Sequence, residues 1–344
     1  SRDIRSAIIP TMRPHPNPNA PFVLGVDIGG TKLATVLATP YGRILRKERL
    51  PTEANKGPDV GVARLISMLH HVLADVDNVG EVRGIGVACG SPMDAEQGII
   101  LGPPNLQSWN PVPIVDILER EFGLYTCLEN DANAGALAEW RFGAGQGRRS
   151  VVYMTMGTGI GGGLVLDGRL YRGANGNAGE VGHMRVVSEG GPLCGCGKRG
   201  CLEAYCSGPS IARRARETLT RAPLAGATMI GLAGSLEAVT AEHLFAAARQ
   251  GDGLALRLVD ETAHLLGVGL ANVIQLLNPE AIVLGTIATE QGDFFLDRVR
   301  CTVQAETWPQ LFEAVEILPS PLGNQAGDYG AISVILEALE IESR

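Results

Sequence analysis

The feature that most limits the possible folds is a strand–turn–strand pattern that occurs twice in the chain. A short apolar strand, a Gly/Thr turn and a returning strand occupy residues 22–38, and the same order recurs in residues 151–166. Consecutive glycines let backbone N–H groups converge on an anion, because no Cβ blocks the approach. An ordinary hairpin turn explains one such segment as well. Two of them favour phosphate binding and a duplicated α/β architecture with a cleft between the halves.

Apolar periodicity predicts the remaining elements of both halves. Strands are expected at 82–88, 125–128, 281–284 and 314–318, and helices at 60–76, 112–122, 132–142, 255–277 and 330–339. We therefore predict a flexible leader at 1–21, an N-terminal α/β domain at 22–130 and a C-terminal α/β domain at 131–344. This division leaves open that the closing helix packs on the N-terminal domain. The Gly/Ala-rich segment 223–240 is expected to be a flexible insertion, either between helices or partly helical.

Two familiar nucleotide motifs are excluded by their context. Gly157, Gly159 and Gly162 fit G-x-G-x-x-G, but that motif needs a helix directly after it, and a returning strand is expected here. The chain also lacks the G-x-x-x-x-G-K-[ST] pattern of P-loop proteins.

Composition limits the partners and the compartment. The 344 residues suit two domains, and the net charge of -8 without a Lys/Arg block argues against nucleic-acid binding. No apolar run reaches the ~18 residues of a membrane span, and the leader lacks the apolar core of a signal peptide. Seven cysteines, three of them clustered, fit a metal site in a reducing compartment better than a disulfide framework. A cytoplasmic location is expected.

Three acidic or amide residues follow predicted strands. Asp27 beside the first turn can hold Mg²⁺ near nucleotide phosphates, or it can simply cap the turn. Asn130 and Asp131 open a predicted helix, where either is suited to capping. A carboxylate at such a strand end can also accept a hydroxyl proton during phosphoryl transfer, which makes Asp131 a candidate general base.

One histidine and three cysteines form the most specific chemical pattern in the chain. His183 precedes Cys194, Cys196 and Cys201, with small residues between the cysteines. One imidazole and three thiolates make a closed tetrahedral zinc site, which leaves no position for water and is therefore structural. Unpaired structural cysteines are the alternative. His183 could bind zinc through one ring nitrogen and keep the other for a ligand.

Together these segments resemble the ROK family of bacterial sugar kinases and sugar-responsive repressors, over residues 22–340. The motifs that carry the resemblance are DIGGTK at 27–32, PNL at 104–106, END at 129–131, GTGIGGG at 157–163, GEVGH at 179–183 and the Cys cluster followed by LEA at 202–204. The resemblance implies an actin/hexokinase-like fold, ATP with Mg²⁺ as cofactors, and a homodimer.

The resemblance also implies roles for individual residues. Asp131 would be the base, and the sugar would be held by Asn105, Asn130, Asp131, Glu180, His183 and Glu203. The nucleotide and its phosphates would lie near Asp27, Gly29, Gly30, Thr31, Lys32, Gly157, Thr158, Gly159 and Gly285. Family members usually carry a Gly-Gly pair after the late strand, whereas Thr286 follows Gly285 here. This departure bears on nucleotide affinity or base preference.

Several functions fit these residues. An ATP-dependent glucokinase is the first, and Glu180 favours plain hexoses. N-acetylmannosamine, N-acetylglucosamine or fructose are alternative substrates, and polyphosphate is an alternative donor. A sugar-sensing ROK repressor is a further alternative, which we rank below the kinase because the proline-rich leader is too short for a helix-turn-helix module.

Overall fold

The computed structural model describes residues 19–74, 76 and 79–342, which fall into two compact units. The first unit comprises the described parts of Ser1–Asp131 and Gly330–Arg344, and the second is Ala132–Tyr329. Most of the predicted leader, up to residue 18, lies outside the described residues.

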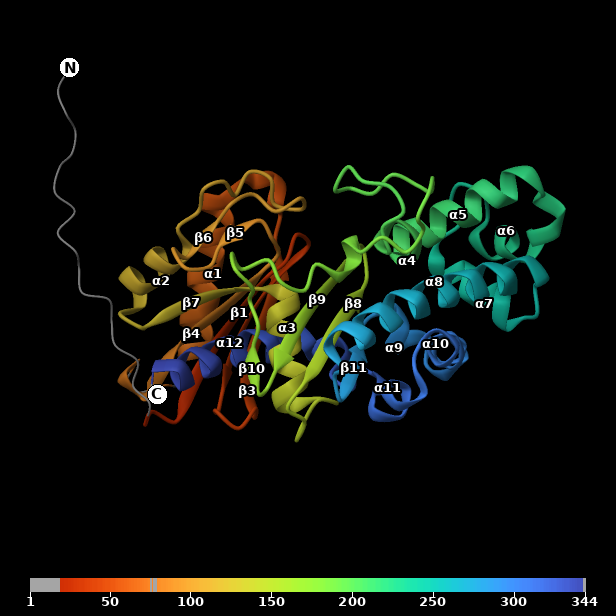
Figure 1. Cartoon of the computed structure of the whole chain (residues 1–344). Helices are drawn as coiled ribbons and strands as arrows, with labels where there is room; N and C mark the ends of the chain where they lie inside the picture. The colour runs from red at the N-terminus through yellow and green to blue at the C-terminus, as the bar shows by residue number, and fades with distance from the viewer. Residues whose placement is uncertain (1–18, 75, 77–78, 343–344) are drawn as a thin grey trace, which may run out of the picture. The chain divides into compact units, whose positions relative to one another are not determined.

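A five-stranded sheet with the order β3-β2-β1-β4-β7 forms the centre of the first unit (Figure 1). β1 pairs antiparallel with β2 and parallel with β4, and β4 pairs parallel with β7. The elements of this unit are β1 (Phe22–Ile28), β2 (Lys32–Ala38), β3 (Ile44–Pro51), α1 (Pro58–Leu73), β4 (Val82–Cys89), β5 (Met93–Asp94), β6 (Ile99–Ile100), α2 (Ile114–Phe122), β7 (Thr126–Asn130) and most of α12 (Ala326–Glu342), with short 3-10 turns at Ala54–Lys56 and Val79–Glu81.

A second five-stranded sheet, β10-β9-β8-β11-β12, repeats this order in the second unit. β8 pairs antiparallel with β9 and parallel with β11, and β11 pairs parallel with β12. The elements are α3 (Asp131–Phe142), β8 (Val151–Met156), β9 (Ile160–Leu166), β10 (Arg169–Leu170), α4 (Glu203–Cys206), α5 (Gly208–Arg221), α6 (Ala227–Ala233), α7 (Ala241–Arg249), α8 (Gly253–Leu277), β11 (Ala281–Leu284), α9 (Ile287–Gln291), α10 (Asp293–Glu306), α11 (Pro309–Ala314) and β12 (Glu316–Pro319), with 3-10 turns at Val181–His183, Pro223–Gly226 and Gly323–Gln325. The shared strand order confirms the predicted duplicated α/β fold.

Each sheet is buried because its strands are apolar along most of their length. β4 and β11 have almost only buried residues, as expected for central strands covered on both faces. Trp109 and Phe295 are fully buried in the two cores. By contrast, β3 carries four consecutive charged residues at 46–49 and lies at a sheet edge, where sequence patterns did not predict a strand.

The closing helix α12 packs on the first sheet through close backbone contacts. A methyl group on Gly86 of β4 would lie 2.1 Å from the Ala331 carbonyl oxygen, and one on Gly84 would lie 2.8 Å from Ile335 Cδ1. Only glycine allows this approach. The segment 223–240 is partly helical, since it contains α6.

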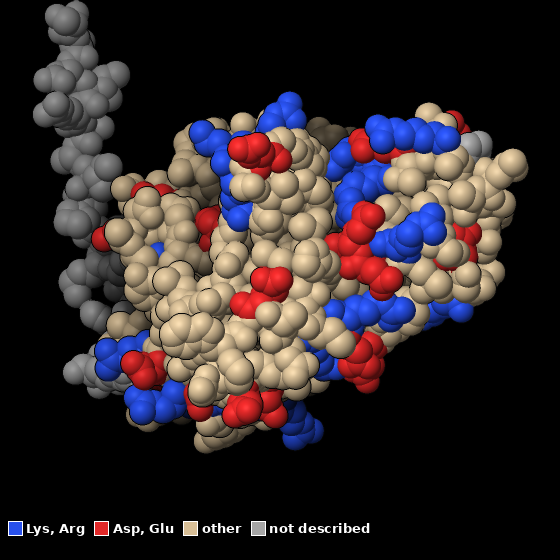
Figure 2. Space-filling view, turned by 45° about the vertical axis from the view of Figure 1, so that its right-hand side comes forward, with Lys and Arg blue, Asp and Glu red and all other residues tan. Residues whose placement is uncertain are grey.

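Positive and negative side chains are interspersed on the face that Figure 2 shows. In the second unit, ion pairs near the surface include Arg213–Glu217, Arg214–Glu261 and Arg298–Asp260. Pairs of this kind contribute about 0–1 kcal/mol each, so the buried cores account for most of the stability. Among the described residues, none of the helices combines the length and apolar character that a membrane span requires.

Candidate active site

The carboxyl ends of β1, β4 and β7 gather the predicted acidic residues of the first unit at one sheet edge. In the parallel register Asp27 lies opposite Ala88, and Cys89 lies opposite Asn130. Burial, followed by the negative charges of Asp131 and Asp27, raises the pKa of the Cys89 thiol. Both carboxylates therefore lie near the same buried thiol.

Asn130 and Asp131 end β7 and begin α3. The Asn130 amide donates to Ser91 Oγ at 2.9 Å, and its backbone N–H donates to Glu129 Oε1 at 3.0 Å. Asp131 is exposed, and a methyl group on Gly90 would lie 3.8 Å from its Oδ2 atom. As the first residue of α3, its carboxylate is favoured by the helix dipole. The aspartate is thus accessible and held on a fixed backbone.

The first Gly turn is fastened by Thr52. Its hydroxyl donates to the Gly29 carbonyl oxygen at 2.5 Å, and its N–H donates to the Thr31 carbonyl oxygen at 3.1 Å. A methyl group on Gly30 would lie only 2.3 Å from Asn105 Cβ. The predicted sugar residue Asn105 therefore packs directly against the predicted phosphate turn, because Gly30 has no side chain.

The second Gly turn connects β8 to β9, so a strand follows it and the dinucleotide motif is excluded as predicted. Its backbone is closed by a bond from Gly157 N–H to the Gly159 carbonyl oxygen at 3.0 Å. Gly208 N–H, at the start of α5, donates to the Gly157 carbonyl oxygen at 2.8 Å. Thr158 is exposed at the tip of the turn.

Glu203 joins this turn to the cysteine cluster. Its Oε2 atom accepts from Ile160 N–H at 2.9 Å, and the Cys194 thiol lies 3.5 Å from its Oε1 atom. A methyl group on Gly159 would lie 2.7 Å from the same Oε2 atom. Gly159 is therefore required for the carboxylate to reach the turn.

The ligand atoms of His183, Cys194, Cys196 and Cys201 all lie within 4.8 Å of one another. The Cys196 and Cys201 sulfurs are 3.7 Å apart, and Cys194 Sγ is 3.6 Å from His183 Nδ1. Zn–S bonds of about 2.3 Å in a tetrahedron place sulfurs about 3.8 Å apart. The residues thus fit the predicted zinc.

The orientation of His183 leaves its second nitrogen away from the cysteines. Nδ1 faces Cys194, while Nε2 lies 3.7 Å from Glu180 Oε2. Both side chains are exposed. A metal on Nδ1 would therefore leave Nε2 beside Glu180, a second predicted sugar residue.

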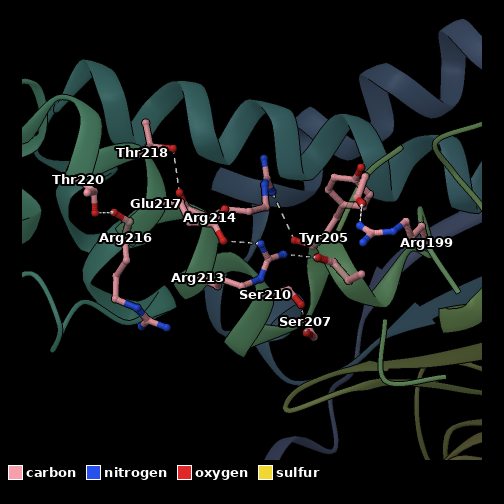
Figure 3. Close-up of polar contacts among 12 residues, drawn as sticks. Arg199, Tyr205, Ser207, Ser210, Arg213, Arg214, Arg216, Glu217, Thr218 and Thr220 are labelled. Atoms are coloured by element: carbon pink, nitrogen blue, oxygen red, sulfur yellow. Dashed lines mark hydrogen bonds and ion pairs between the residues drawn. The ribbon is translucent and has the colours of Figure 1, made fainter. Parts of the chain in front are cut away.

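Two arginines of α5 fasten the short helix α4, whose first residue is Glu203 (Figure 3). Arg213 donates to the Ala204 carbonyl oxygen at 2.9 Å. Arg214 donates to the Tyr205 carbonyl oxygen at 3.3 Å and to Glu261 at 2.7 Å, and its guanidinium lies 5.8 Å from the centre of the Tyr205 ring. These bonds satisfy carbonyls at the end of a helix too short to be stable alone. No sequence motif indicated this support.

A pocket of about 390 Å³ lies beside the second Gly turn, entirely within the second unit. It is bounded by the turn, the N-terminus of α5, the start of α7 and helix α9. The lining residues are Gly157, Thr158, Gly208, Pro209, Ala212, Thr240, Ala241, Glu242, Phe245, Thr286, Ile287, Glu290 and Gln291. Of these, Gly157 and Thr158 were predicted from the sequence to bind the nucleotide, and Thr286 was related to nucleotide affinity only as a departure from the Gly-Gly pair. The others come from segments without a local motif. The volume falls in the range of small-molecule sites.

Gly285 lies at the end of β11 and does not line this pocket, but Thr286 does. A methyl group on Gly285 would lie 2.6 Å from the Tyr153 hydroxyl, which explains the glycine. Thr286 has φ 52° and ψ −117°, a conformation that favours glycine and is disfavoured for a β-branched residue. Such backbone strain costs about 1–3 kcal/mol and tends to occur at functional sites.

These observations define a class of protein: an α/β fold of the actin and hexokinase type, with a Gly turn after the first strand of each sheet. The ROK family model matches residues 23–338, and the chain belongs to the ROK family.

The chain is 37% identical over 317 residues to a glucokinase from Thermotoga maritima, covering 92% of this chain and 98% of that one. It resembles the crystal structure of a ROK family glucokinase from Streptomyces griseus in complex with glucose and AMPPNP, with a TM-score of 0.75 and 35% identity over 90% of this chain and 98% of that one. It is also 30% identical over 322 residues to a xylose repressor from Bacillus spizizenii, covering 93% of this chain and 78% of the repressor.

Proposed function

We propose that this protein is an ATP-dependent hexose kinase that converts glucose to glucose 6-phosphate. The observation that carries this proposal is the second Gly turn opening onto a pocket of about 390 Å³. The resemblance to glucokinases over nearly the whole chain supports it, as does the solved relative that holds glucose and AMPPNP. Glucose is thus favoured over fructose, N-acetylglucosamine and N-acetylmannosamine.

Asp131 is the general base of this reaction. Its exposed carboxylate takes the proton of the sugar hydroxyl as the hydroxyl oxygen attacks the γ-phosphorus of ATP. A new O–P bond forms, the bond to the β-phosphate oxygen breaks, and ADP leaves with that electron pair. Asn130, whose amide donates to Ser91 Oγ, orients a neighbouring sugar hydroxyl.

The resemblance to sugar kinases assigns sugar-binding roles to Asn105, Asn130 and Asp131. It assigns the same kind of role to Glu180, His183 and Glu203. Carboxylates, amides and an imidazole suit this task, because each sugar hydroxyl needs both a donor and an acceptor. Ile160 N–H, at the end of the second Gly turn, donates to the Glu203 carboxylate. This bond supports a role in which the same carboxylate contacts both the sugar and the turn.

The nucleotide occupies the pocket beside the second Gly turn, with its phosphates toward the Gly157–Gly159 amides. The resemblance also assigns phosphate contacts to Gly29, Gly30, Thr31 and Lys32. Asp27, near the end of β1, would hold Mg²⁺; its position at the same sheet edge as Asp131 supports this role. When bound, Mg²⁺ neutralises phosphate charge. Zinc at His183 and the three cysteines is structural. We place the reaction in the cytoplasm and expect a homodimer.

Release of ADP from Mg-ATP across a sugar panel tests the proposal directly. The panel contains glucose, mannose, fructose, N-acetylglucosamine, N-acetylmannosamine and allose, with water alone as the control. We expect the highest kcat/KM with glucose. Equal rates with and without sugar would contradict a kinase, and a higher kcat/KM with another sugar would replace the substrate.

A sugar-responsive regulator is the second candidate, favoured by the resemblance to xylose repressors. Calorimetry with glucose or xylose, alongside the ADP assay, separates the two functions. Sugar binding without any turnover, together with retention on promoter DNA, would favour the regulator.

A further inference from the structure

Thr286 holds an unfavourable backbone conformation next to the second Gly turn. Four non-glycine residues with positive φ occur in the described ranges, namely Glu53, Asp167, Asn278 and Thr286. Glu53 and Asn278 have ordinary left-handed helical angles, with ψ of 50° and 57°. Thr286, with ψ −117°, lies outside that region, and it is the only β-branched residue among the four.

The surrounding backbone fixes Thr286 from both sides. Gly285 N–H donates to the Met154 carbonyl oxygen at 2.8 Å, and Glu290 N–H donates to the Thr286 carbonyl oxygen at 2.9 Å. The chain must therefore turn at residue 286 to leave β11 and enter α9. A glycine would make this turn without strain, so a threonine at this position calls for a compensating contact.

The compensating contact is a hydrogen bond from the Thr286 side chain to the end of β8. Its Oγ1 atom accepts from Met156 N–H at 2.8 Å. Met156 directly precedes Gly157, and a methyl group on Gly157 would lie 3.9 Å from both Oγ1 and Cγ2 of Thr286. The side chain thus stands against the base of the turn, and Thr286 also lines the pocket.

We propose that Thr286 is a positioning residue for the phosphoryl donor: its hydroxyl fixes the Gly157–Gly159 turn at the entrance of the pocket. The inference rests on the proposed kinase function. The strained backbone points the hydroxyl at Met156 N–H, and the bond transmits this fixed position to the turn amides. Without the hydroxyl the turn gains freedom, and the donor phosphates bind less tightly.

Three substitutions at residue 286 distinguish the contribution of the hydroxyl from that of the backbone strain. Thr286→Val keeps the branched shape and loses the acceptor, Thr286→Ser keeps the acceptor, and Thr286→Gly removes both the acceptor and the strain. Thr289→Val is the matched control, because the Thr289 hydroxyl donates to the Leu284 carbonyl oxygen at 2.9 Å and the residue does not line the pocket. Melting temperatures show whether each variant is folded.

We expect Thr286→Val and Thr286→Gly to raise KM for Mg-ATP about fivefold or more, the loss associated with one hydrogen bond. KM for glucose and kcat should stay within about twofold of the wild type. Thr286→Ser should restore KM for Mg-ATP, and Thr289→Val should leave it unchanged. Thr286→Gly should melt no lower than the wild type, since relief of strain offsets the lost bond.

The result that would overturn the inference is a KM for Mg-ATP within twofold of wild type in folded Thr286→Val and Thr286→Gly. If the wild type phosphorylates no sugar, the proposed function fails, and calorimetry with Mg-ADP then tests Thr286 separately. A dissociation constant at least fivefold weaker in Thr286→Val supports the positioning role. Equal binding, or no binding by the wild type, overturns it.

Discussion

Glu203 shows how a single side chain connects two local structures. One carboxylate oxygen accepts from the backbone of the second Gly turn at 2.9 Å, and the other lies 3.5 Å from the Cys194 thiol. A rotation of this side chain would disturb both. The second Gly turn and the loop that carries the cysteines are therefore expected to respond together to substitutions at residue 203.

Asp131→Asn should lower kcat about 10²- to 10⁴-fold while KM for glucose changes little. Asparagine keeps the shape of the side chain and one acceptor oxygen but cannot accept the hydroxyl proton. Steady-state kinetics at saturating Mg-ATP measures both constants. Asp167→Asn is the control, because Asp167 lies in an exposed turn and pairs with Arg149 at 2.9 Å. A kcat near the wild-type value in Asp131→Asn would refute the assignment of the base.

The free energy of unfolding should depend on pH through Glu139. The direction of its pKa shift determines the sign of this dependence. Burial raises its pKa above 4.5, opposed by hydrogen bonds from Ser320 Oγ and Ala144 N–H. The folded state therefore favours the protonated form. That contribution to the free energy of unfolding is complete below pH 4.5 and is lost as the pH rises through the raised pKa.

In Glu139→Gln this dependence should disappear, because glutamine remains neutral at every pH. Thermal melts from pH 4.5 upward should show the variant gaining stability relative to the wild type. A difference in melting temperature that stays constant over this range, or that moves in favour of the wild type, would mean that the Glu139 carboxyl does not titrate as described.

At the scale of elements, features that depend on neighbouring residues could be predicted from the sequence, whereas features that depend on long-range contacts could not. The turns, the Asn130-Asp131 pair and the cysteine cluster could be found because their chemistry depends on neighbours in sequence. β3 was missed because its edge position lets it carry exposed charged residues. The pocket walls from α5, α7 and α9 were missed because the fold, and no motif, brings them together.

The loop that carries the cysteines should contain about one zinc ion per chain, measured by elemental analysis after gel filtration. Cys201→Ser should lose most of the metal and loosen the segment around Glu180 and His183, since a structural zinc contributes directly to folding. Cys301→Ser, which removes an exposed cysteine outside the cluster, should keep its zinc. Equal metal contents in the two variants would exclude the four-ligand site.

Contact between α12 and the first sheet should make Gly86→Ala strongly destabilising. The added methyl group would lie 2.1 Å from a backbone oxygen, which cannot move aside as a side chain can. We expect a loss of about 2–3 kcal/mol in the free energy of unfolding. Gly231→Ala in the exposed part of α6 has nothing within 4 Å and should stabilise by up to about 1 kcal/mol. Denaturant titration compares the two, and similar stabilities would contradict close packing.

At the scale of the whole molecule, the duplicated strand order could be predicted in outline from the two turns alone. Each sheet places its Gly turn between the first strand and its antiparallel neighbour, β1 with β2 and β8 with β9. The roles of individual sugar contacts remain predictions, because they depend on side-chain positions that strand patterns do not determine. The sequence marks Thr286 as a departure from the family's Gly-Gly pair, but its backbone strain could not be predicted, since strain is a property of φ and ψ.

Substrate should stabilise the protein as a whole. Glucose at about 100 times its dissociation constant should add about 2.7 kcal/mol to the free energy of unfolding, because it binds the folded chain alone. Thermal melts with glucose, and with a panel sugar that gives no turnover, provide the comparison. An unchanged melting temperature at saturating glucose would contradict a sugar site in the folded protein.

The return of the final helix to the first unit has a consequence for how the chain is made. Residues from Gly330 onward belong to the same unit as β1, and glycines of its sheet are shaped to receive them. During translation, the second unit (Ala132–Tyr329) is fully synthesised before the part of α12 that belongs to the first unit. We therefore expect the first unit to complete its fold after the second, once α12 covers the glycines of its sheet.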